Sequence, residues 1–254
     1  MKMRTGVPIG EEGSVSVSVP VSAPASVPVS EHEHEHEYGN ASGNVNASVI
    51  ASLLFLVFLA LPACTPQGDP GIGSGYTDRF ERPQLGKDWK KTGGSWAIEA
   101  GELHVLGARN HPLWLLRTLP GDVRVEFDVR SETPDGDIKV EIFGDGTSFA
   151  KTDSYKATSY VIIFGGWNNS RNVLARMDEH GADRMVGEPR KVEPGRTYHF
   201  RIERVGPRLS VWVDDEVLLE MSDSDPLQGR GHDHFGFNNW QSDLWFDNLE
   251  ITPL

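Results

Sequence analysis

The chain has 254 residues, and its 24 Lys and Arg against 37 Asp and Glu give a formal net charge of −13. This acidic balance argues against a nucleic-acid partner, since phosphate binding needs a basic surface. It also disfavours attraction to anionic lipid, so any membrane link should be covalent or hydrophobic. The single cysteine, Cys64, excludes an intrachain disulfide and paired-cysteine metal or redox motifs.

Residues 1–48 form a predicted low-complexity, disordered leader. The segment 14–29 repeats Val, Ser, Ala and Pro, and its prolines would interrupt any strand ladder. The EHEHEHE run that follows, residues 31–37, has two interpretations. It is either simple-sequence repetition upstream of the true start codon, or a loose divalent-metal tract through His32, His34 and His36.

The apolar run 49–63 is followed directly by Cys64. It is shorter than the roughly 20 residues of a transmembrane helix and has the length of a signal-peptide core. Leu61, Ala63 and Cys64 resemble the lipobox of bacterial lipoproteins, in which the cysteine is lipidated and becomes the mature N-terminus. The segment 49–64 therefore predicts export and a lipid anchor at Cys64. The alternative is an uncleaved apolar anchor.

Residues 65–75 are rich in Gly and Pro and predict a tether after the anchor. An aspartate directly after the lipidated cysteine is similar to the retention signal of inner-membrane lipoproteins, and Thr65 stands there instead. We therefore expect the protein in the cell envelope, at the outer rather than the inner membrane.

Residues 76–254 predict one all-β domain. Short alternating runs of apolar and polar residues are separated by Gly, Asp, Asn and Pro, and no run keeps a 3.6-residue period. Gly206-Pro207 and Asp214-Asp215 mark two hairpin turns. Many short strands at this spacing indicate a sandwich or a barrel. We expect strands at 96–99, 102–106, 114–117, 123–129, 138–143, 160–164, 173–177, 198–205, 209–213, 217–221, 234–238 and 244–251.

Three segments resemble the concanavalin A-like lectin and glucanase superfamily. They are FERPQLGKDW followed by GSWAIEAGEL, then RTYHFRIERVGPRLSVWVDDEVLL, then HFGFNNWQSDLWFDNLEITPL. The resemblance covers about 175 residues and extends, more distantly, to domains of the 3-keto-disaccharide hydrolase type. It implies a jelly-roll β-sandwich of two antiparallel sheets and a poly- or oligosaccharide partner, but it does not specify an activity.

The string Gly136–Glu141 is the nearest approach to a glycosidase motif. On an extended strand, Asp137, Lys139 and Glu141 share one face, with the apolar residues between them on the other. Asp137 and Glu141 would lie roughly 13 Å apart, too far for either two-carboxylate mechanism of glycoside hydrolysis. We therefore take these three residues as candidate ligand-binding groups on a polar face, the alternative being a plain solvent face.

Two polar-aromatic strings, FGGWNNSRNVLARMDEHGADR and GHDHFGFNNW, carry the stronger candidates. Sugar sites need aromatic planes together with amide and carboxylate groups. The alternative is that the tryptophans pack at strand ends while the asparagines close turns. We expect one concavity to hold Trp167, Arg176, Asp178, His180, His234, Asn238 and Trp240, with Asn168 as a further ligand-binding residue.

Within that concavity His180 or His234 is the expected acid or base, because imidazole titrates near neutrality. Asp178 would orient it. No cofactor is identified and the identity of any metal is unknown. His232 and His234 have the spacing of metal ligands on one strand face, and a structural calcium ion is compatible with Asp247 or the Asp214-Asp215 turn.

These observations predict an exported, membrane-anchored lipoprotein with a glycan-binding or glycan-processing domain. Two alternatives stay open. One is a structural or protein-interaction role in the envelope, favoured if both tryptophans are buried. The other is a glycoside hydrolase or a polysaccharide lyase, since Tyr155, Lys156 and Tyr160 resemble part of the strand motif of alginate lyases.

Overall fold

The computed structural model describes residues 68–152 and 155–254. The expected leader, the apolar run and Cys64 lie outside these residues, so the predictions made for them stay predictions. The described residues belong to one compact unit, Cys64–Leu254. Within the described part of the chain, no helix is long and apolar enough to cross a membrane.

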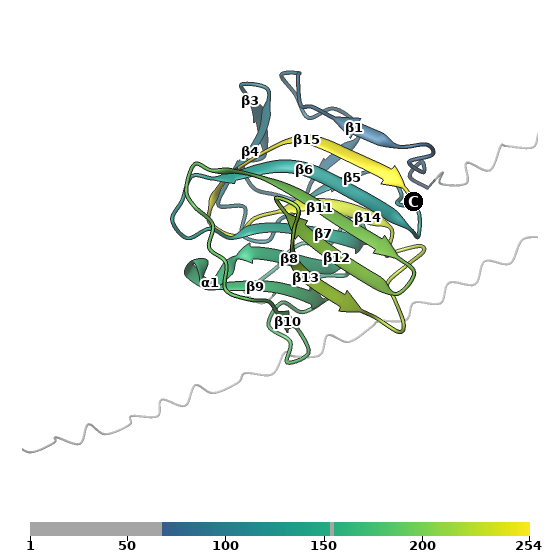
Figure 1. Ribbon diagram of the computed structural model, residues 1–254. Coiled ribbons are helices and arrows are strands. Elements are labelled where there is room, and N and C mark those ends of the chain that lie inside the picture. The colour runs from purple at the N-terminus through teal and green to yellow at the C-terminus, as the bar shows by residue number, and fades with distance from the viewer. Residues whose placement is uncertain (1–67, 153–154) are drawn as a thin grey trace, which may run out of the picture. The chain divides into compact units, whose positions relative to one another are not determined.

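Two antiparallel sheets make up this unit (Figure 1). The first has the order β13-β12-β11-β6-β15-β4-β3, with β1 paired to β15. Its strands are β1 (Tyr76–Asp78), β3 (Ala97–Glu99), β4 (Glu102–Leu106), β6 (Val123–Ser131), β11 (Thr197–Val205), β12 (Arg208–Val213), β13 (Glu216–Ser222) and β15 (Asp243–Pro253).

The second sheet has the order β10-β9-β8-β7-β14-β5-β2. One helical turn, α1 (Gly166–Asn169), follows β8. The strands of this sheet are β2 (Trp89–Lys91), β5 (Leu113–Leu115), β7 (Ile138–Gly144), β8 (Tyr160–Gly165), β9 (Arg171–Arg176), β10 (Met185–Val186) and β14 (His234–Asn238).

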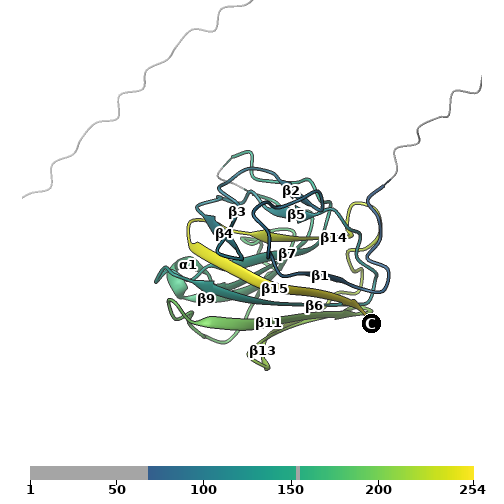
Figure 2. The same cartoon turned by 90° about the horizontal axis from the view of Figure 1, so that it is seen from above.

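The core lies between the sheets, which Figure 2 shows as two layers with β6, β11 and β15 in one and β7 and β14 in the other. Aromatic rings fill its centre. Phe127 of the first sheet stacks on Phe200 at 5.1 Å between centroids and meets Phe237 of the second sheet edge-on at 5.5 Å. Alternation along β6 is strict, with every second residue buried, which is why the periodicity of this segment predicted its strand.

The outer face of the second sheet is also covered, and this decides where a site can be. Trp114 of β5 is fully buried on this face. A second apolar cluster lies on the same sheet and includes Val161, Ile163, Val173 and Ala175, with Ala150, Tyr155 and Ala157 packed against them. The segments 145–152 and 155–159 therefore bury much of a face that the sequence alone leaves open to solvent.

The all-β sandwich and its two antiparallel sheets are confirmed. The predicted tether 65–75 needs a correction at its end, because Ile72 is buried and its backbone N–H donates to the carbonyl of Thr118 at 3.1 Å. The folded unit therefore begins several residues before Tyr76. Burial of one isoleucine and two backbone hydrogen bonds to Thr118 are what hold this segment on the sandwich.

Candidate functional site

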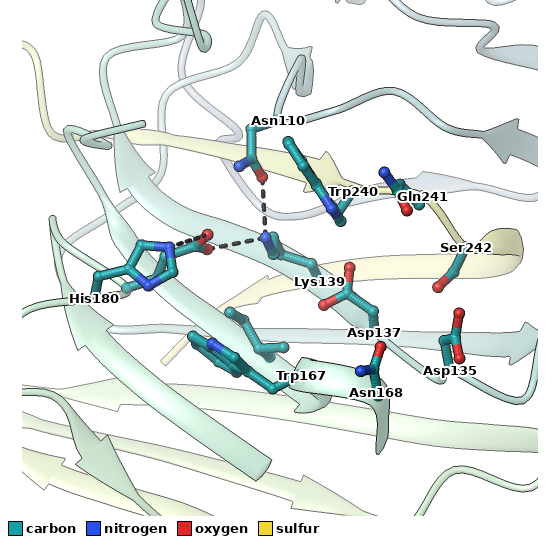
Figure 3. A pocket seen from close by; sticks show the side chains of 12 residues that line it. Asn110, Asp135, Asp137, Lys139, Trp167, Asn168, His180, Trp240, Gln241 and Ser242 are labelled. Carbon is teal, nitrogen blue, oxygen red and sulfur yellow. Dashed lines mark hydrogen bonds and ion pairs between the residues drawn. The ribbon is translucent and has the colours of Figure 1, made fainter. Parts of the chain in front are cut away.

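A cavity of about 370 Å³ opens on the outer face of the second sheet, near the first residues of β7 (Figure 3). The cavity is of the size that small ligands occupy in proteins. Its walls combine aromatic, amide and charged side chains. They are Asn110, Asp135, Asp137, Lys139, Ile163, Trp167, Asn168, Glu179, His180, Trp240, Gln241 and Ser242.

Trp167 and Trp240 lie on opposite sides of the cavity, with Asp137 and Lys139 between them (Figure 3). Both rings are half-buried. Trp167 stands on α1 and Trp240 follows β14, so two parts of the chain that are far apart in sequence supply the two aromatic walls. The expectation that these tryptophans share one groove with His180 agrees with this geometry.

The backbone that carries Trp167 is in the left-handed region. Trp167, Asn168 and Asn169 have φ values of 51°, 58° and 57°, a conformation that costs about 1–2 kcal/mol for each residue with a side chain. Hydrogen bonds from neighbouring loops hold the turn. The Asn169 side chain accepts from the N–H of Val192 at 2.8 Å and donates to its carbonyl at 2.7 Å. The strained turn thus fixes Trp167 at the cavity wall.

Lys139 is the only lysine or arginine among the residues that line the cavity, and it is almost fully buried. Its ammonium Nζ lies 2.9 Å from Glu179 Oε2 and donates to Asn110 Oδ1 at 3.0 Å. Burial alone would lower the pKa of Lys139, but the carboxylates of Asp137 and Glu179 outweigh it and raise that pKa. Lys139 is therefore a fixed cation, and one of its three N–H donors has no partner among the described residues.

Asp137 presents a carboxyl group with a raised pKa to the cavity. Burial raises its pKa above the ordinary value, and the neighbouring carboxylate of Glu179 adds to the effect, while Lys139 opposes it. Within the described chain its Oδ2 atom is buried without a hydrogen-bond partner. An unpartnered, basic carboxylate oxygen on the cavity floor can accept a hydroxyl group or a proton from a ligand.

Glu141 lies below the floor and is fully buried. It accepts hydrogen bonds from Ser159 Oγ at 2.6 Å, Asn238 Nδ2 at 2.6 Å and the Tyr155 hydroxyl at 3.0 Å. Burial nevertheless raises the pKa of Glu141 to about 7. Glu141 and Asn238, both expected to touch a ligand, instead support the floor from beneath. Tyr155, which resembled part of the alginate lyase motif, has the same supporting role, because its hydroxyl donates to Glu141.

His180 lines the cavity as an exposed ring, edge-on to Trp167 at 5.6 Å, with Nε2 3.6 Å from Glu179 Oε1. Asp178 does not orient its imidazole. Asp178 Oδ1 accepts instead from the backbone N–H of His180 at 2.9 Å, which closes the local turn. The expected acid-base pair of His180 and Asp178 is therefore not assembled.

Arg176 and His234, which we expected in the same concavity, lie outside it. Arg176 is the last residue of β9, at the opposite end of that strand from α1. Its Nε donates to Asp223 Oδ2 at 3.0 Å. His234 lies between Asp69 and Asp233, with nitrogen–oxygen distances of 3.0 and 2.7 Å. A carboxylate remote in sequence contacts each side chain, Asp223 for Arg176 and Asp69 for His234, which a strand pattern cannot reveal.

Asn110 is the important cavity residue that sequence reasoning missed, whereas Glu179 belongs to a string that it singled out. Glu179 stands inside the polar-aromatic string 164–184, so its neighbours gave a signal. Asn110 gave none, because it reaches the site only through backbone pairing of its loop with Asn239.

Among the described residues, no group of three or more His, Cys, Asp and Glu side chains has the arrangement of a metal site. Asp214 is engaged by Arg190 and Arg196, at 3.3 and 2.8 Å. His232 Nδ1 lies 2.7 Å from the carbonyl oxygen of Thr158. Calcium binding at Asp247 or Asp214 stays a prediction.

The two antiparallel sheets form a β-sandwich of the galectin-like type. The chain belongs to the 3-keto-alpha-glucoside-1,2-lyase-like domain family, whose model matches residues 75–252. The concanavalin A-like resemblance of the sequence is thereby confirmed. No curated protein matches the sequence.

Solved structures share the fold at low sequence identity. A Bacillus subtilis protein of unknown function with a galectin-like fold has a TM-score of 0.53 at 12% identity, over 70% of this chain and 94% of its own. Carbohydrate-binding module CBM66 from Bacillus subtilis has a TM-score of 0.50 at 16% identity, over 66% and 98%. The Crh5 transglycosylase, in its apo form, has a TM-score of 0.52 at 10% identity, over 74% and 88%.

Proposed function

We propose that the domain binds a saccharide in the cavity between Trp167 and Trp240. The observation that carries this proposal is the placement of two half-buried tryptophans on opposite sides of a floor that holds a carboxylate and a fixed ammonium group. Sugars have apolar faces that stack on aromatic rings and hydroxyl groups that need charged or amide partners. A role in protein interaction would need no such pairing of rings with buried charges.

Binding of methyl α-glucoside and of its 3-keto derivative to the purified protein tests this proposal. We expect Trp167→Ala and Trp240→Ala to weaken binding by about 1–3 kcal/mol, roughly 5- to 150-fold, through lost stacking and burial. Trp212→Ala is the matched control, because Trp212 is a half-buried tryptophan on the other sheet. Titration calorimetry measures the affinities. Equal losses in all three variants, or none in the first two, would contradict the proposal.

The family description directs the chemical proposal to elimination in a 3-keto-α-glucoside. The ketone at C3 acidifies the hydrogen at C2. When a base removes that proton, its electron pair forms the C1=C2 double bond, the C1–O bond breaks, and the leaving oxygen takes up a proton. Asp137 is our candidate base, because its raised pKa makes its carboxylate more basic. The free donor of Lys139 can hold the charge that develops on the C3 oxygen.

Asp137→Asn distinguishes elimination from binding alone. We expect the variant to bind methyl 3-keto-α-glucoside within a few-fold of the wild type and to form no product. The product carries a double bond conjugated to the ketone, so ultraviolet absorbance follows the reaction. His180→Ala is the companion variant. If it abolishes product formation while Asp137→Asn retains it, the imidazole is the base and our assignment of Asp137 is wrong.

Export with a lipid anchor at Cys64 is a separate proposal, which rests on the lipobox-like residues Leu61, Ala63 and Cys64. Cys64→Ser should release the protein from the membrane fraction. Fractionation with immunoblotting reads out both location and size. A variant that stays in the membrane at full length would identify residues 49–63 as an uncleaved anchor instead.

A further inference from the structure

We propose that the cavity is closed at one end and therefore takes the terminal residue of an α-glucan, not a residue inside the chain. This inference rests on the proposed saccharide binding and adds the substrate class. Its basis is the set of contacts that fill the outer face of the second sheet beyond Lys139.

Trp114 fills the far part of this face. Its indole lies flat against two glycines of neighbouring strands, so close that a Cβ at Gly144 would stand 2.4 Å from the ring and one at Gly236 2.8 Å. The loop after β7 covers the ring, and Trp114 Nε1 donates to the carbonyl of Ser148 at 2.9 Å. The ring of Trp114 offers no platform to a sugar, because it is wholly enclosed by protein.

The middle of the face is filled by the segment 155–159. The Tyr155 hydroxyl donates to Glu141, and Tyr155 and Ala157 pack with Val161 and Ala175. Tyr155 is 5% exposed and Ala157 2% exposed. A glycan that ran along the sheet would have to displace this packed layer.

Lys139 forms the boundary between the filled face and the cavity. Asn110 reaches its ammonium group from the loop before β5, and Glu179 reaches it from the loop after β9. These loops approach β7 from its two lateral sides within the sheet. β14 and β5 lie on one side of β7, whereas β8 and β9 lie on the other. The Asn110–Lys139–Glu179 bridge therefore joins two loops across the end of the cavity, and the side chains of Lys139 and Glu179 are 3% and 8% exposed.

The other side of the cavity is open and polar. Asp135, Asn168 and Gln241 are exposed, and Figure 3 shows Asp135 and Gln241 on the side away from His180 and Asn110. Figure 3 shows Trp240 and Asp137 between this open side and Lys139, so a saccharide that enters here reaches the bridge last. Only a residue with a free end can be accommodated, because the chain cannot continue past the bridge.

A linear and a cyclic α-glucan of equal length test this inference with the full-length protein. Maltoheptaose and β-cyclodextrin each contain seven α-1,4-linked glucoses, but only the former has ends. Each is titrated as a competitor against bound methyl α-glucoside. We expect maltoheptaose to displace it and β-cyclodextrin to be about 100-fold less effective, because the ring cannot reach both tryptophans.

Displacement by both glucans with similar potency would overturn the inference, since an internal residue would then fit. Displacement by neither would overturn it too, since a chain end would then be excluded. In both cases binding of methyl α-glucoside itself is unaffected, so the proposed function survives. If methyl α-glucoside and its 3-keto derivative do not bind at all, the proposed function fails together with the inference.

Discussion

Glu141 is a buried carboxyl group whose pKa the fold raises into the neutral range. Three donors surround it, yet its pKa is raised to about 7 because burial outweighs their hydrogen bonds. The unfolded chain ionises this group near its ordinary value of 4.5. Between these two values the unfolded state binds fewer protons than the folded state, so the contribution of Glu141 makes the protein less stable as pH rises.

We predict that Glu141→Gln removes this decrease in folding stability at higher pH. The shift implies that ionisation of Glu141 costs on the order of 3 kcal/mol of folding free energy between about pH 4.5 and pH 7. A glutamine keeps the shape, accepts from Asn238 and donates to Ser159. The unfolding free energy of the variant relative to the wild type should therefore rise steadily from pH 5 to pH 7.5. Urea denaturation at several pH values measures it, and parallel curves would contradict the prediction.

The alternation of Asp137, Lys139 and Glu141 on one strand face was predictable from sequence, because a strand has a period of two. Which of them meets solvent was not predictable. Asp137 lines the cavity, whereas Glu141 lies under side chains of the segments 145–152 and 155–159. Capture of Arg176 by Asp223 was equally hidden, since 47 residues separate the pair. The sequence pattern predicts which side chains share a strand face, whereas contacts between distant segments decide which of those side chains are buried.

At the scale of elements, the packing of Trp114 of β5 against β7 and β14 depends on two glycines. Gly236 and Gly144 lie under the ring of Trp114, which would meet a Cβ at either position. The three strands can therefore pack a tryptophan against their surface without a gap, which explains why a glycine stands in the middle of a strand that should disfavour it.

Gly236→Ala should destabilise the domain by about 1–3 kcal/mol through overpacking against Trp114. For a domain of this size the melting temperature should fall by roughly 5 °C. Gly121→Ala is the control, because no atom lies within 4 Å of a Cβ placed there and its backbone is not in the left-handed region. Thermal unfolding followed by near-ultraviolet circular dichroism compares the two. A variant Gly236→Ala as stable as the control would show that the ring moves freely.

The longer strands could be predicted because their alternation is strong, as in β6 and β11. Three short strands were missed, β1, β2 and β10, with two or three residues each. Such segments are too short to show a period. They become strands only because a neighbour offers an edge, as Ile251 and Leu249 of β15 do for β1.

At the scale of the whole molecule, the segment before β1 fastens the start of the domain. Asp69 pairs with His234, and Ile72 is buried against the core. A fragment 68–254 should therefore be more stable than a fragment 76–254 by about 2 kcal/mol, the free energy of burying one isoleucine. Ile72→Ala in the longer fragment should reproduce most of the difference. Denaturant titration measures all three, and equal midpoints for the two fragments would show that the segment adds nothing.

The described chain begins at the same end of the sandwich as its C-terminus, whereas α1, which carries Trp167, lies at the other end in both Figure 1 and Figure 2. The start of β15, next to Trp240, lies at that same far end. A sensor surface or resin that holds a fragment 68–254 by residue 68 would therefore leave the cavity between Trp167 and Trp240 facing the liquid.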